Sequence, residues 1–386
     1  MRQTYKIIPI YTADVSGVCS ALYELGGMTV MHDPSGCNST YNTHDEIRWY
    51  DQDSLIYISG LTEIDAIMGN DEKFLNDIMD AARELKPRFI ALAGSPIPYM
   101  NGTDFPALAE VLEQELGIPA FSVPTNGMHD YVYGAGLALE QIARQFVSAK
   151  AVCEEKNIQP HTVNLLGVTP LDFGAYSRAG YMKQNLEKCG WKVLSTWAMG
   201  DDLETLSHTL EAEVNLVVSS VGLRTAKYLE KEYKMPYVVG TPVGTFTEEI
   251  VQALEKKERY PYKRFREENL NKEQPGSGRN DKEVMLIGEP VTTESLALAI
   301  EQKYGISVHV LCPLQETEDL LFRTSRQVLG EEEMEEALKD ADIIVADPLY
   351  RPICQKKSEF YELPHLAFSG RIYKKKLEKI GDFWKY

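Results

Sequence analysis

One stretch of this 386-residue chain combines residue types that could carry chemistry. It is MHDPSGCNSTYNTHD, residues 31 to 45, which places a cysteine in a Pro-Ser-Gly turn. His32 precedes Cys37 and His44 follows it, so the three side chains could form part of a tetrahedral metal site. The same thiol could instead be a nucleophile with a nearby imidazole as its base, or a small buried side chain without a chemical role. The spacing leaves all three interpretations open.

The six cysteines lie far apart in the sequence and form neither a CxxC pair nor a zinc-finger pattern. The N-terminus, MRQTYKIIPIYTADVSG, lacks the long apolar core of a signal peptide, and no stretch reaches the length of a membrane span. We therefore expect a cytoplasmic protein with no membrane partner. In that reducing compartment disulfides are disfavoured, so each cysteine is expected to be either buried filler or an individual ligand.

Charge and motifs exclude several classes of protein. The formal net charge is −18 and the pI is about 4.9, which argues against a nucleic-acid partner because phosphate binding needs a basic surface. The chain contains no GxxxxGK[ST] loop and no clean GxGxxG after its first predicted strand, so we expect it to bind no nucleotide. It also lacks the GxSxG elbow of the serine hydrolases.

Short runs rich in Val, Ile and Leu alternate with longer amphipathic stretches, a pattern typical of βαβ units and parallel sheets. The predicted strands fall into three groups, namely 28–31, 54–59, 88–94 and 119–124; then 162–170, 192–198, 213–220 and 237–240; then 282–290, 307–313 and 341–348. The clearest helix is predicted at 70–87, with Phe74, Ile78 and Ala81 on one face and Pro87 as its stop. The fold class is therefore α/β, with three Rossmann-like parallel-sheet domains.

The predicted domain boundaries follow these groups. Residues 1–152 form the first domain, which carries Cys37, and 153–256 form the second. The third is 282–386, including a C-terminal segment. Between the last two, residues 257–281 are charged and contain Pro-Gly-Ser-Gly, which predicts a polar surface connection rather than a packed element. Because ligands of doubly wound sheets bind beyond the carboxyl ends of the strands, the loops at those ends are the candidate binding loops.

Three motifs in residues 11–130 resemble the first domain of nitrogenase component 1 proteins. MTVMHDPSGCNSTY is similar to that family's strand followed by His-Gly-Pro-x-Gly-Cys, with Asp33 in place of the glycine. ISGLTEIDAIMGNDEKFLNDI, residues 58 to 78, resembles its segment leading to Gly-x-x-x-Lys-Leu and a helix. FIALAGSPIPYMNGTDFPALAEVLEQELGIPAFSVPTNG resembles its strand, Cys-Pro turn and next strand. Weaker similarity continues through 215–244 and the C-terminal LPHLAFSGRIY, so a nitrogenase component 1-like fold is implied.

The resemblance implies a metal cluster with few ligands in this chain. Family members with a full set supply three cysteines per subunit, and here the matching positions are Tyr11, Cys37 and Ser95. One thiolate cannot hold an iron–sulfur cluster alone, so the cluster would be shared between chains, in a homodimer or in a heterodimer with a cysteine-richer paralogue. The family's cofactor-anchoring cysteine has no counterpart near Ser219, and His365 resembles the cofactor-ligating histidine with a spacing one residue short. We therefore expect no nitrogen fixation.

By the same resemblance, the chain is a nitrogenase-like reductase subunit that receives electrons from a separate, transiently docked ATP-dependent iron–sulfur reductase. Cys37 is the implied cluster ligand, and no catalytic residue is assigned. Further pocket candidates are Tyr11, His32, Ser95, Arg224 and His365. Two alternatives stay open: a non-catalytic partner or scaffold for metallocofactor assembly, and a small-molecule binding protein. GLTEIDAIMGNDEK could belong to a docking face, or its acidic residues could simply start two solvated helices.

Overall fold

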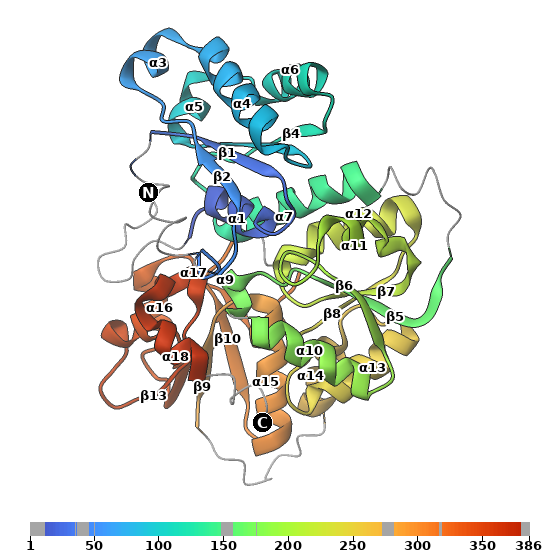
Figure 1. The fold of residues 1–386 in the computed structure, drawn as a ribbon. Helices are drawn as coiled ribbons and strands as arrows, with labels where there is room; N and C mark the ends of the chain where they lie inside the picture. The colour runs from blue at the N-terminus through green and yellow to red at the C-terminus, as the bar shows by residue number, and fades with distance from the viewer. Residues whose placement is uncertain are drawn as a thin grey trace.

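A computed structural model describes residues 12–34, 36, 46–49, 51–147, 157–174, 176–271, 282–315 and 319–379. The chain forms three parallel β-sheets, each flanked by helices, and the expected α/β class is confirmed (Figure 1). We call the three sheets with their helices the first, second and third units. The exact domain boundaries stay a prediction. None of the helices in these ranges is long and apolar enough to cross a membrane.

The first unit has a four-stranded sheet in the order β2-β1-β3-β4. Its elements are α1 (Asp14–Leu22), β1 (Met28–His32), β2 (Leu55–Ile58), α3 (Glu63–Met68), α4 (Asp71–Leu85), β3 (Ile90–Gly94), α5 (Pro96–Asn101), α6 (Phe105–Leu116), β4 (Ala120–Val123) and α7 (Tyr131–Ile142), which continues as a π-helical turn, η2 (Ala143–Val147). Side chains alternate along each strand. Val30 and Leu92 therefore pack under α4 and α6, whereas Met31 and Ala91 face α1 and α7.

Helices α1 and α7 are in backbone contact, and two glycines allow this. A Cβ atom on Gly17 would lie 2.2 Å from the Tyr131 carbonyl oxygen, and one on Gly134 would lie 1.9 Å from the Asp14 carbonyl oxygen. No larger residue fits at either position without separating the helices. Because α7 also packs against α12 of the second unit, this close crossing connects the first unit to the rest of the molecule (Figure 1).

The second unit has the strand order β6-β5-β7-β8. Its elements are β5 (Gln159–Leu166), α9 (Pro170–Phe173), α10 (Tyr176–Lys188), β6 (Lys192–Thr196), α11 (Leu203–Ser207), η3 (Thr209–Glu211), β7 (Ala212–Val217), η4 (Ser220–Gly222), α12 (Leu223–Tyr233), β8 (Tyr237–Val239) and α13 (Phe246–Lys256). One apolar core runs through this unit, through the third unit and through the α1–α7 face of the first. The second and third units and that face therefore share a core and do not fold as separate lobes.

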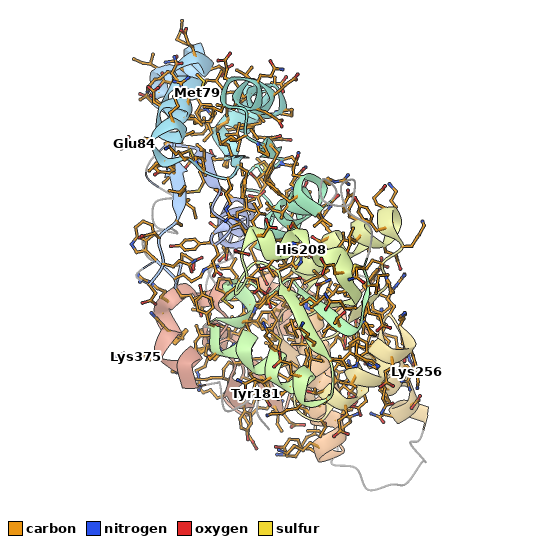
Figure 2. The ribbon with its side chains drawn as sticks, turned by 45° about the vertical axis from the view of Figure 1, so that its right-hand side comes forward. Met79, Glu84, Tyr181, His208, Lys256 and Lys375 are labelled. Atoms are coloured by element: carbon orange, nitrogen blue, oxygen red, sulfur yellow. The ribbon has the colours of Figure 1, made fainter. Side chains whose placement is uncertain are left out.

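The third unit has a five-stranded sheet in the order β11-β10-β9-β12-β13. Its elements are α14 (Pro261–Asn271), β9 (Val284–Ile287), α15 (Pro290–Tyr304), β10 (Val308–Cys312), β11 (Arg326–Gln327), α16 (Glu331–Ala337), β12 (Ile343–Ala346), η5 (Pro348–Ile353), β13 (Glu359–Glu362), α17 (Leu366–Ser369), η6 (Gly370–Tyr373) and α18 (Lys374–Lys379). Side chains of all three units fill the space between the ribbons (Figure 2).

Every strand predicted from the sequence is present, and the helix predicted at 70–87 is α4. Phe74 and Ile78 are buried as expected, and α4 ends at Leu85, where Lys86 adopts a left-handed conformation. The edge strands β11 and β13 were missed, because β11 has two residues and β13 is the polar sequence EFYE. Edge strands of this kind carry little of the apolar pattern that identifies a buried strand.

The predicted polar connection is wrong for residues 261 to 271, which form α14 and pack against α15. Tyr262 is fully buried, and its hydroxyl donates to the Leu320 carbonyl oxygen at 2.6 Å. Arg266 is only 1% exposed and forms ion pairs with Glu294 and Glu301. The charge of Arg266 is thus neutralised inside the protein by two glutamates of α15, a pairing that the composition of the segment could not reveal.

This packing predicts a large penalty for removing the Arg266 side chain. Arg266→Ala leaves two buried carboxylates unpaired, so we expect it to lower the free energy of unfolding by about 3–5 kcal/mol. Arg264→Ala on the same helix is the matched control. Its partners Glu258 and Glu268 are partly exposed, so its expected cost is below about 1 kcal/mol. Urea denaturation of both variants checks this, and equal costs would show that α14 is not a packed helix.

Candidate functional site

The carboxyl ends of the first sheet bring together the predicted residues His32 and Ser95. His32 ends β1, and its Nδ1 lies 2.8 Å from the Ser59 hydroxyl, just beyond β2. The Asp33 amide donates to the same hydroxyl at 3.2 Å. Ser95 directly follows β3, and the Thr125 hydroxyl, beyond β4, donates to the Gly94 carbonyl at 2.9 Å. This is the edge at which a doubly wound sheet binds ligands.

The Ser95 hydroxyl is a buried polar group that makes no hydrogen bond with the described residues. Ser95 is 1% exposed and occupies the N-cap position of α5, yet its side chain makes no capping hydrogen bond. Its Oγ has no hydrogen-bond partner in the described part of the chain. Burying an unpaired hydroxyl costs about 1–3 kcal/mol, so such a group usually faces a ligand or another partner. Tyr11 and Cys37, the other two predicted positions at this edge, lie outside the described residues.

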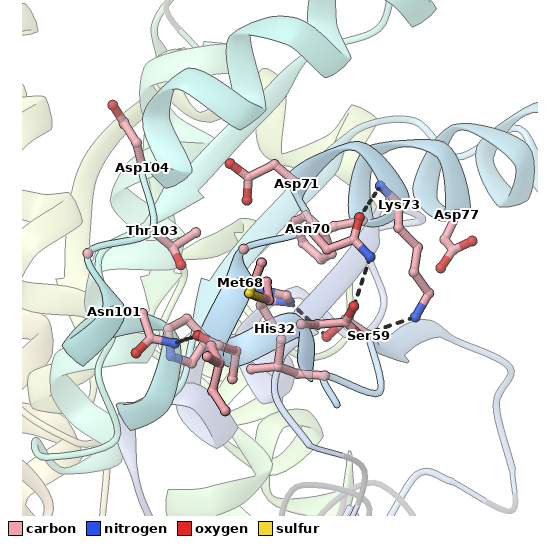
Figure 3. A pocket seen from close by; sticks show the side chains of 18 residues that line it. His32, Ser59, Met68, Asn70, Asp71, Lys73, Asp77, Asn101, Thr103 and Asp104 are labelled. Carbon is pink, nitrogen blue, oxygen red and sulfur yellow. Dashed lines mark hydrogen bonds and ion pairs between the residues drawn. The ribbon is translucent and has the colours of Figure 1, made fainter. Parts of the chain in front are cut away.

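His32 forms one wall of a cavity of about 470 Å³, which we call the His32 cavity (Figure 3). The imidazole packs between two aromatic rings, with centroid distances of 4.2 Å to Phe74 and 5.9 Å to Phe105. Burial lowers the pKa of His32, although Asp71 and Asp65 oppose this effect. The ring is therefore neutral near pH 7, and it can accept or donate a single hydrogen bond at each nitrogen according to its tautomer.

The rim of the His32 cavity is acidic. Asp65 accepts hydrogen bonds from Thr62 and from Asn70, and it contacts the Lys73 ammonium at 3.4 Å. These hydrogen bonds, with that of Thr62 the strongest, lower the pKa of Asp65. Thr62 and Asp65 form the capping box of α3, so the interpretation of these acids as helix starts is confirmed. Asp71, in the first turn of α4, adds to the negative charge.

Beside this rim, two short helices expose large apolar side chains to solvent. We define the α3–α5 patch as Ile64, Ile67, Met68, Tyr99 and Met100, which are between 57% and 79% exposed. A hydrogen bond joins the two helices, because the Asn101 side-chain amide of α5 donates to the Ala66 carbonyl oxygen of α3 at 2.8 Å. A cluster of exposed apolar residues bordered by charges is typical of a protein–protein contact surface.

A second polar cluster, which we call the Asp172 cluster, lies where the three units meet. The Asp172 carboxylate accepts hydrogen bonds from Tyr131 of the first unit and from Ser219 and Thr169 of the second, the last two at 2.8 and 2.9 Å. His365 of the third unit places its Nε2 3.4 Å from Asp172 Oδ1, the oxygen that also accepts from Tyr131. Burial and the nearby Asp172 charge raise the pKa of Tyr131 well above its usual value, so its phenol stays protonated.

Glu289 extends the Asp172 cluster into the third unit. It is fully buried and accepts hydrogen bonds from the backbone amides of Ser220, at 2.7 Å, and of Thr292, at 2.8 Å. Burial, and next the charge of Asp172, raise the pKa of Glu289. Nearby, the Asp347 carboxylate accepts a hydrogen bond from the backbone amide of His365 at 2.7 Å, which positions the loop that carries His365.

The Asp172 cluster occupies the place that the sequence resemblance assigns to a catalytic metallocofactor. Ser219 and His365 stand at the two anchoring positions, and both contact Asp172. Across the part of the chain that the structure describes, no group of three or more His, Cys, Asp or Glu side chains is arranged to hold a metal ion. At the two positions that the resemblance assigns to cofactor ligands, this chain therefore has a serine and a histidine that contact one of its own carboxylates.

The predicted site residues thus separate into three places. His32 and Ser95 share the strand-end edge of the first unit, His365 joins the Asp172 cluster, and Arg224 lines a different cavity. Sequence reasoning missed Asp172 and Glu289, although the loops that carry them were recognised as strand-end loops. Their Gly, Ser and Thr content indicated turns and helix caps, and both acids do cap or start helices, but only the tertiary structure brings them together.

A family model for nitrogenase component 1 type oxidoreductases matches residues 17–348. Because the match covers most of the chain, the protein belongs to the nitrogenase component 1 type oxidoreductases, and the resemblance noted from the sequence is confirmed. The solved structure of nitrogenase Cp1 at pH 5 superposes with a TM-score of 0.66 at 16% identity, covering 99% of this chain and 89% of the other. At that identity the structural match supports a shared fold.

Among curated proteins, one of the subunits of light-independent protochlorophyllide reductase is similar to part of this chain. The protein from Angiopteris evecta is 30% identical over 196 residues, which are 49% of this chain and 38% of the relative. The one from Staurastrum punctulatum is 30% identical over 185 residues, or 46% and 35% of the two chains. The match therefore spans little more than a third of the length of these relatives.

The Asp172 cluster predicts a cost for removing one hydroxyl. Tyr131→Phe deletes a donor to a buried carboxylate without changing the packing, so we expect the free energy of unfolding to fall by about 1–3 kcal/mol. Tyr304→Phe is the control, because Tyr304 is 63% exposed and should change stability by less than about 0.5 kcal/mol. Chemical denaturation gives both values. If Tyr131→Phe leaves the free energy of unfolding unchanged, the buried Asp172 does not depend on the hydrogen bond from Tyr131.

Proposed function

We propose that this chain is a nitrogenase-like reductase subunit that shares an iron–sulfur cluster at a dimer interface and receives electrons from a separate ATP-dependent iron–sulfur reductase. The observation that carries the proposal is the unpaired Ser95 hydroxyl at the strand-end edge, beside the exposed α3–α5 patch. Membership of the nitrogenase component 1 family and the partial similarity to a light-independent protochlorophyllide reductase support a reductase. The proposal does not include nitrogen fixation.

The cluster would be held by Cys37 of this chain, with Ser95 as an oxygen ligand or hydrogen-bond donor. A buried hydroxyl without a partner in the described residues fits that role, since it could bond a cluster sulfide or ligate iron as an alkoxide. An iron–sulfur cluster supplies one-electron transfer at low potential. The missing thiolates would come from a second chain, either a copy of this one or a cysteine-richer paralogue.

The electron donor would dock on the α3–α5 patch. An apolar surface rimmed by Asp65 and Asp71 matches a partner that presents apolar side chains bordered by basic ones. The docked reductase would then stand next to the edge that carries Ser95. Short separation between donor and acceptor is what electron transfer requires of such an arrangement, so the same face would serve both docking and transfer.

A second candidate function is that of a non-catalytic partner or scaffold in metallocofactor assembly. The Asp172 cluster favours it, because Ser219 and His365, at the two positions that the resemblance assigns to cofactor ligands, contact Asp172 of the same chain. In that case a partner chain would supply the reacting centre, and this chain would shape the interface. The iron-binding experiment separates the two functions.

The first test is the iron and acid-labile sulfide content, with the visible spectrum, of protein purified without oxygen. The chain is expressed alone and with any cysteine-richer paralogue encoded beside it. We expect bound iron in the wild type, its loss in Cys37→Ala, and a lower content or shifted spectrum in Ser95→Ala. Cys189→Ala is the control, because Cys189 is an exposed thiol of the second unit. Wild type without iron under both conditions would favour the scaffold function.

The docking surface gives a separate prediction. Ile67→Glu combined with Met68→Glu adds charge to the α3–α5 patch without touching the core, since these residues are 79% and 78% exposed. We expect affinity for the ATP-dependent reductase to fall about tenfold or more, because apolar contacts at an interface centre carry most of its energy. Ile158→Glu, an exposed apolar position in the second unit, should leave the affinity unchanged. Biolayer interferometry measures all three proteins, and equal binding would exclude this face.

A further inference from the structure

The His32 cavity borders the α3–α5 patch and shares residues with it. Ile67 and Met68 of the patch line the cavity, and Pro98 and Asn101 of α5 form another part of its wall. A protein that docks on the patch would therefore be able to place one of its side chains in the cavity. Side chains that fill a pocket of this kind are commonly the anchors of a protein–protein interface.

The lining of the cavity carries a surplus of negative charge. Four aspartates and one lysine line it, and the lysine, Lys73, is already paired with Asp65 at 3.4 Å. Asp71, in the first turn of α4, is exposed, and its carboxylate forms neither a hydrogen bond nor an ion pair with any residue that the structure describes. Such a carboxylate can accept hydrogen bonds from an incoming cation without losing a partner in the protein.

The imidazole of His32 supplies a second acceptor, on a buried wall of the same cavity (Figure 3). His32 is only 9% exposed, and its Nδ1 lies 2.8 Å from the Ser59 hydroxyl. Its Nε2 makes no hydrogen bond with the described residues. When Nδ1 donates to Ser59, Nε2 is an acceptor. Burial lowers the pKa of His32, and of the two carboxylates that oppose this effect Asp71 is the stronger, which indicates that the two acceptors lie near each other.

Apolar side chains form much of the remaining wall, among them Met68, Phe74 and Pro98. A lysine side chain matches this combination of surfaces. Its four methylene groups can pack against apolar walls, and its compact ammonium group has three donors that can reach acceptors in different directions. An arginine matches it less well, because its planar fork suits both oxygens of one carboxylate and not two acceptors on different elements.

We propose that the His32 cavity receives a lysine side chain of the docked electron donor, whose ammonium group is held by the Asp71 carboxylate and by Nε2 of His32. This inference rests on the proposed function, because it names what the partner presents at the α3–α5 patch. It also deepens that function. Apolar contacts across the patch supply affinity, whereas one charged side chain in a cavity fixes the orientation of the two proteins and selects against partners without it.

The first test needs no partner. It is an NMR titration of the full-length chain, with carbon-13 in the rings of its seven histidines, at fixed ionic strength. The probe is N-acetyl-lysinamide, and His32→Gln identifies the His32 signal. We expect a saturable shift of that signal at millimolar probe concentration. N-acetyl-norleucinamide, which lacks the ammonium group, should give none, and N-acetyl-argininamide should give a smaller one.

The second test uses the ATP-dependent reductase and Asp71→Asn, which changes an exposed side chain and leaves the core intact. We expect Asp71→Asn to weaken binding of the lysine probe and to lower the affinity for the reductase about fivefold or more in biolayer interferometry. Glu72→Gln is the matched control, because Glu72 is also exposed in the first turn of α4 but does not line the cavity. Asp71→Asn keeps this test decisive if His32→Gln fails to fold.

Three results would overturn the proposal: no shift of the His32 signal with the lysine probe, an equal or larger shift with either of the other probes, or equal effects of Asp71→Asn and Glu72→Gln. The last would mean that cations respond to the general negative charge of the surface. Failure of the proposed docking face has a different signature. In that case the reductase would bind the Ile67→Glu, Met68→Glu variant as tightly as the wild type, whatever the cavity variants do.

Discussion

The arrangement of the three units depends on one buried carboxylate, Asp172, because a buried carboxylate needs hydrogen-bond donors around it. Asp172 is buried at the meeting point of the three sheets, and a charge in that position is tolerated only when donors surround it. Tyr131 comes from the first unit, Thr169 and Ser219 from the second, and His365 contacts it from the third. The three parallel sheets, which already share an apolar core, are thereby fixed in one relative arrangement. The close α1–α7 crossing, made possible by two glycines, brings Tyr131 to the position where it can take part.

That arrangement also decides where chemistry can take place. Where the units meet, Asp172 and Glu289 accept hydrogen bonds from other units, and a cavity of about 440 Å³ is lined by residues of all three units. Several buried hydroxyls have no hydrogen-bond partner among the described residues, and Ser95 at the edge of the first sheet is one of them. Buried polar groups are normally satisfied, so each exception is a position where a further partner can bond. Ser95 directly precedes α5, which carries part of the exposed α3–α5 patch.

Charged side chains are arranged differently in the interior and on the surface of the protein. The chain is strongly acidic, and two of its buried cations are paired internally, Arg266 with Glu294 and Glu301, and Arg48 with Glu24 and Glu46. The acidic surplus lies on the surface, including the rim of the His32 cavity beside the α3–α5 patch. A face that combines negative charge with exposed apolar side chains selects a partner of opposite charge and suppresses self-association.

The sequence by itself determined the fold class, every buried strand and the family, because apolar periodicity and ordered motifs are local properties that survive divergence. It also named His32 and Ser95 as candidates, which lie at the ends of the neighbouring strands β1 and β3, and their role stays a prediction. It could not identify Asp172, Glu289 and Tyr131 as one cluster, and it misjudged α14, because in each case a polar residue is explained only by a partner from a distant part of the chain. That partner determines whether a charged side chain is solvated or buried, and only the packing of the three units brings the two together.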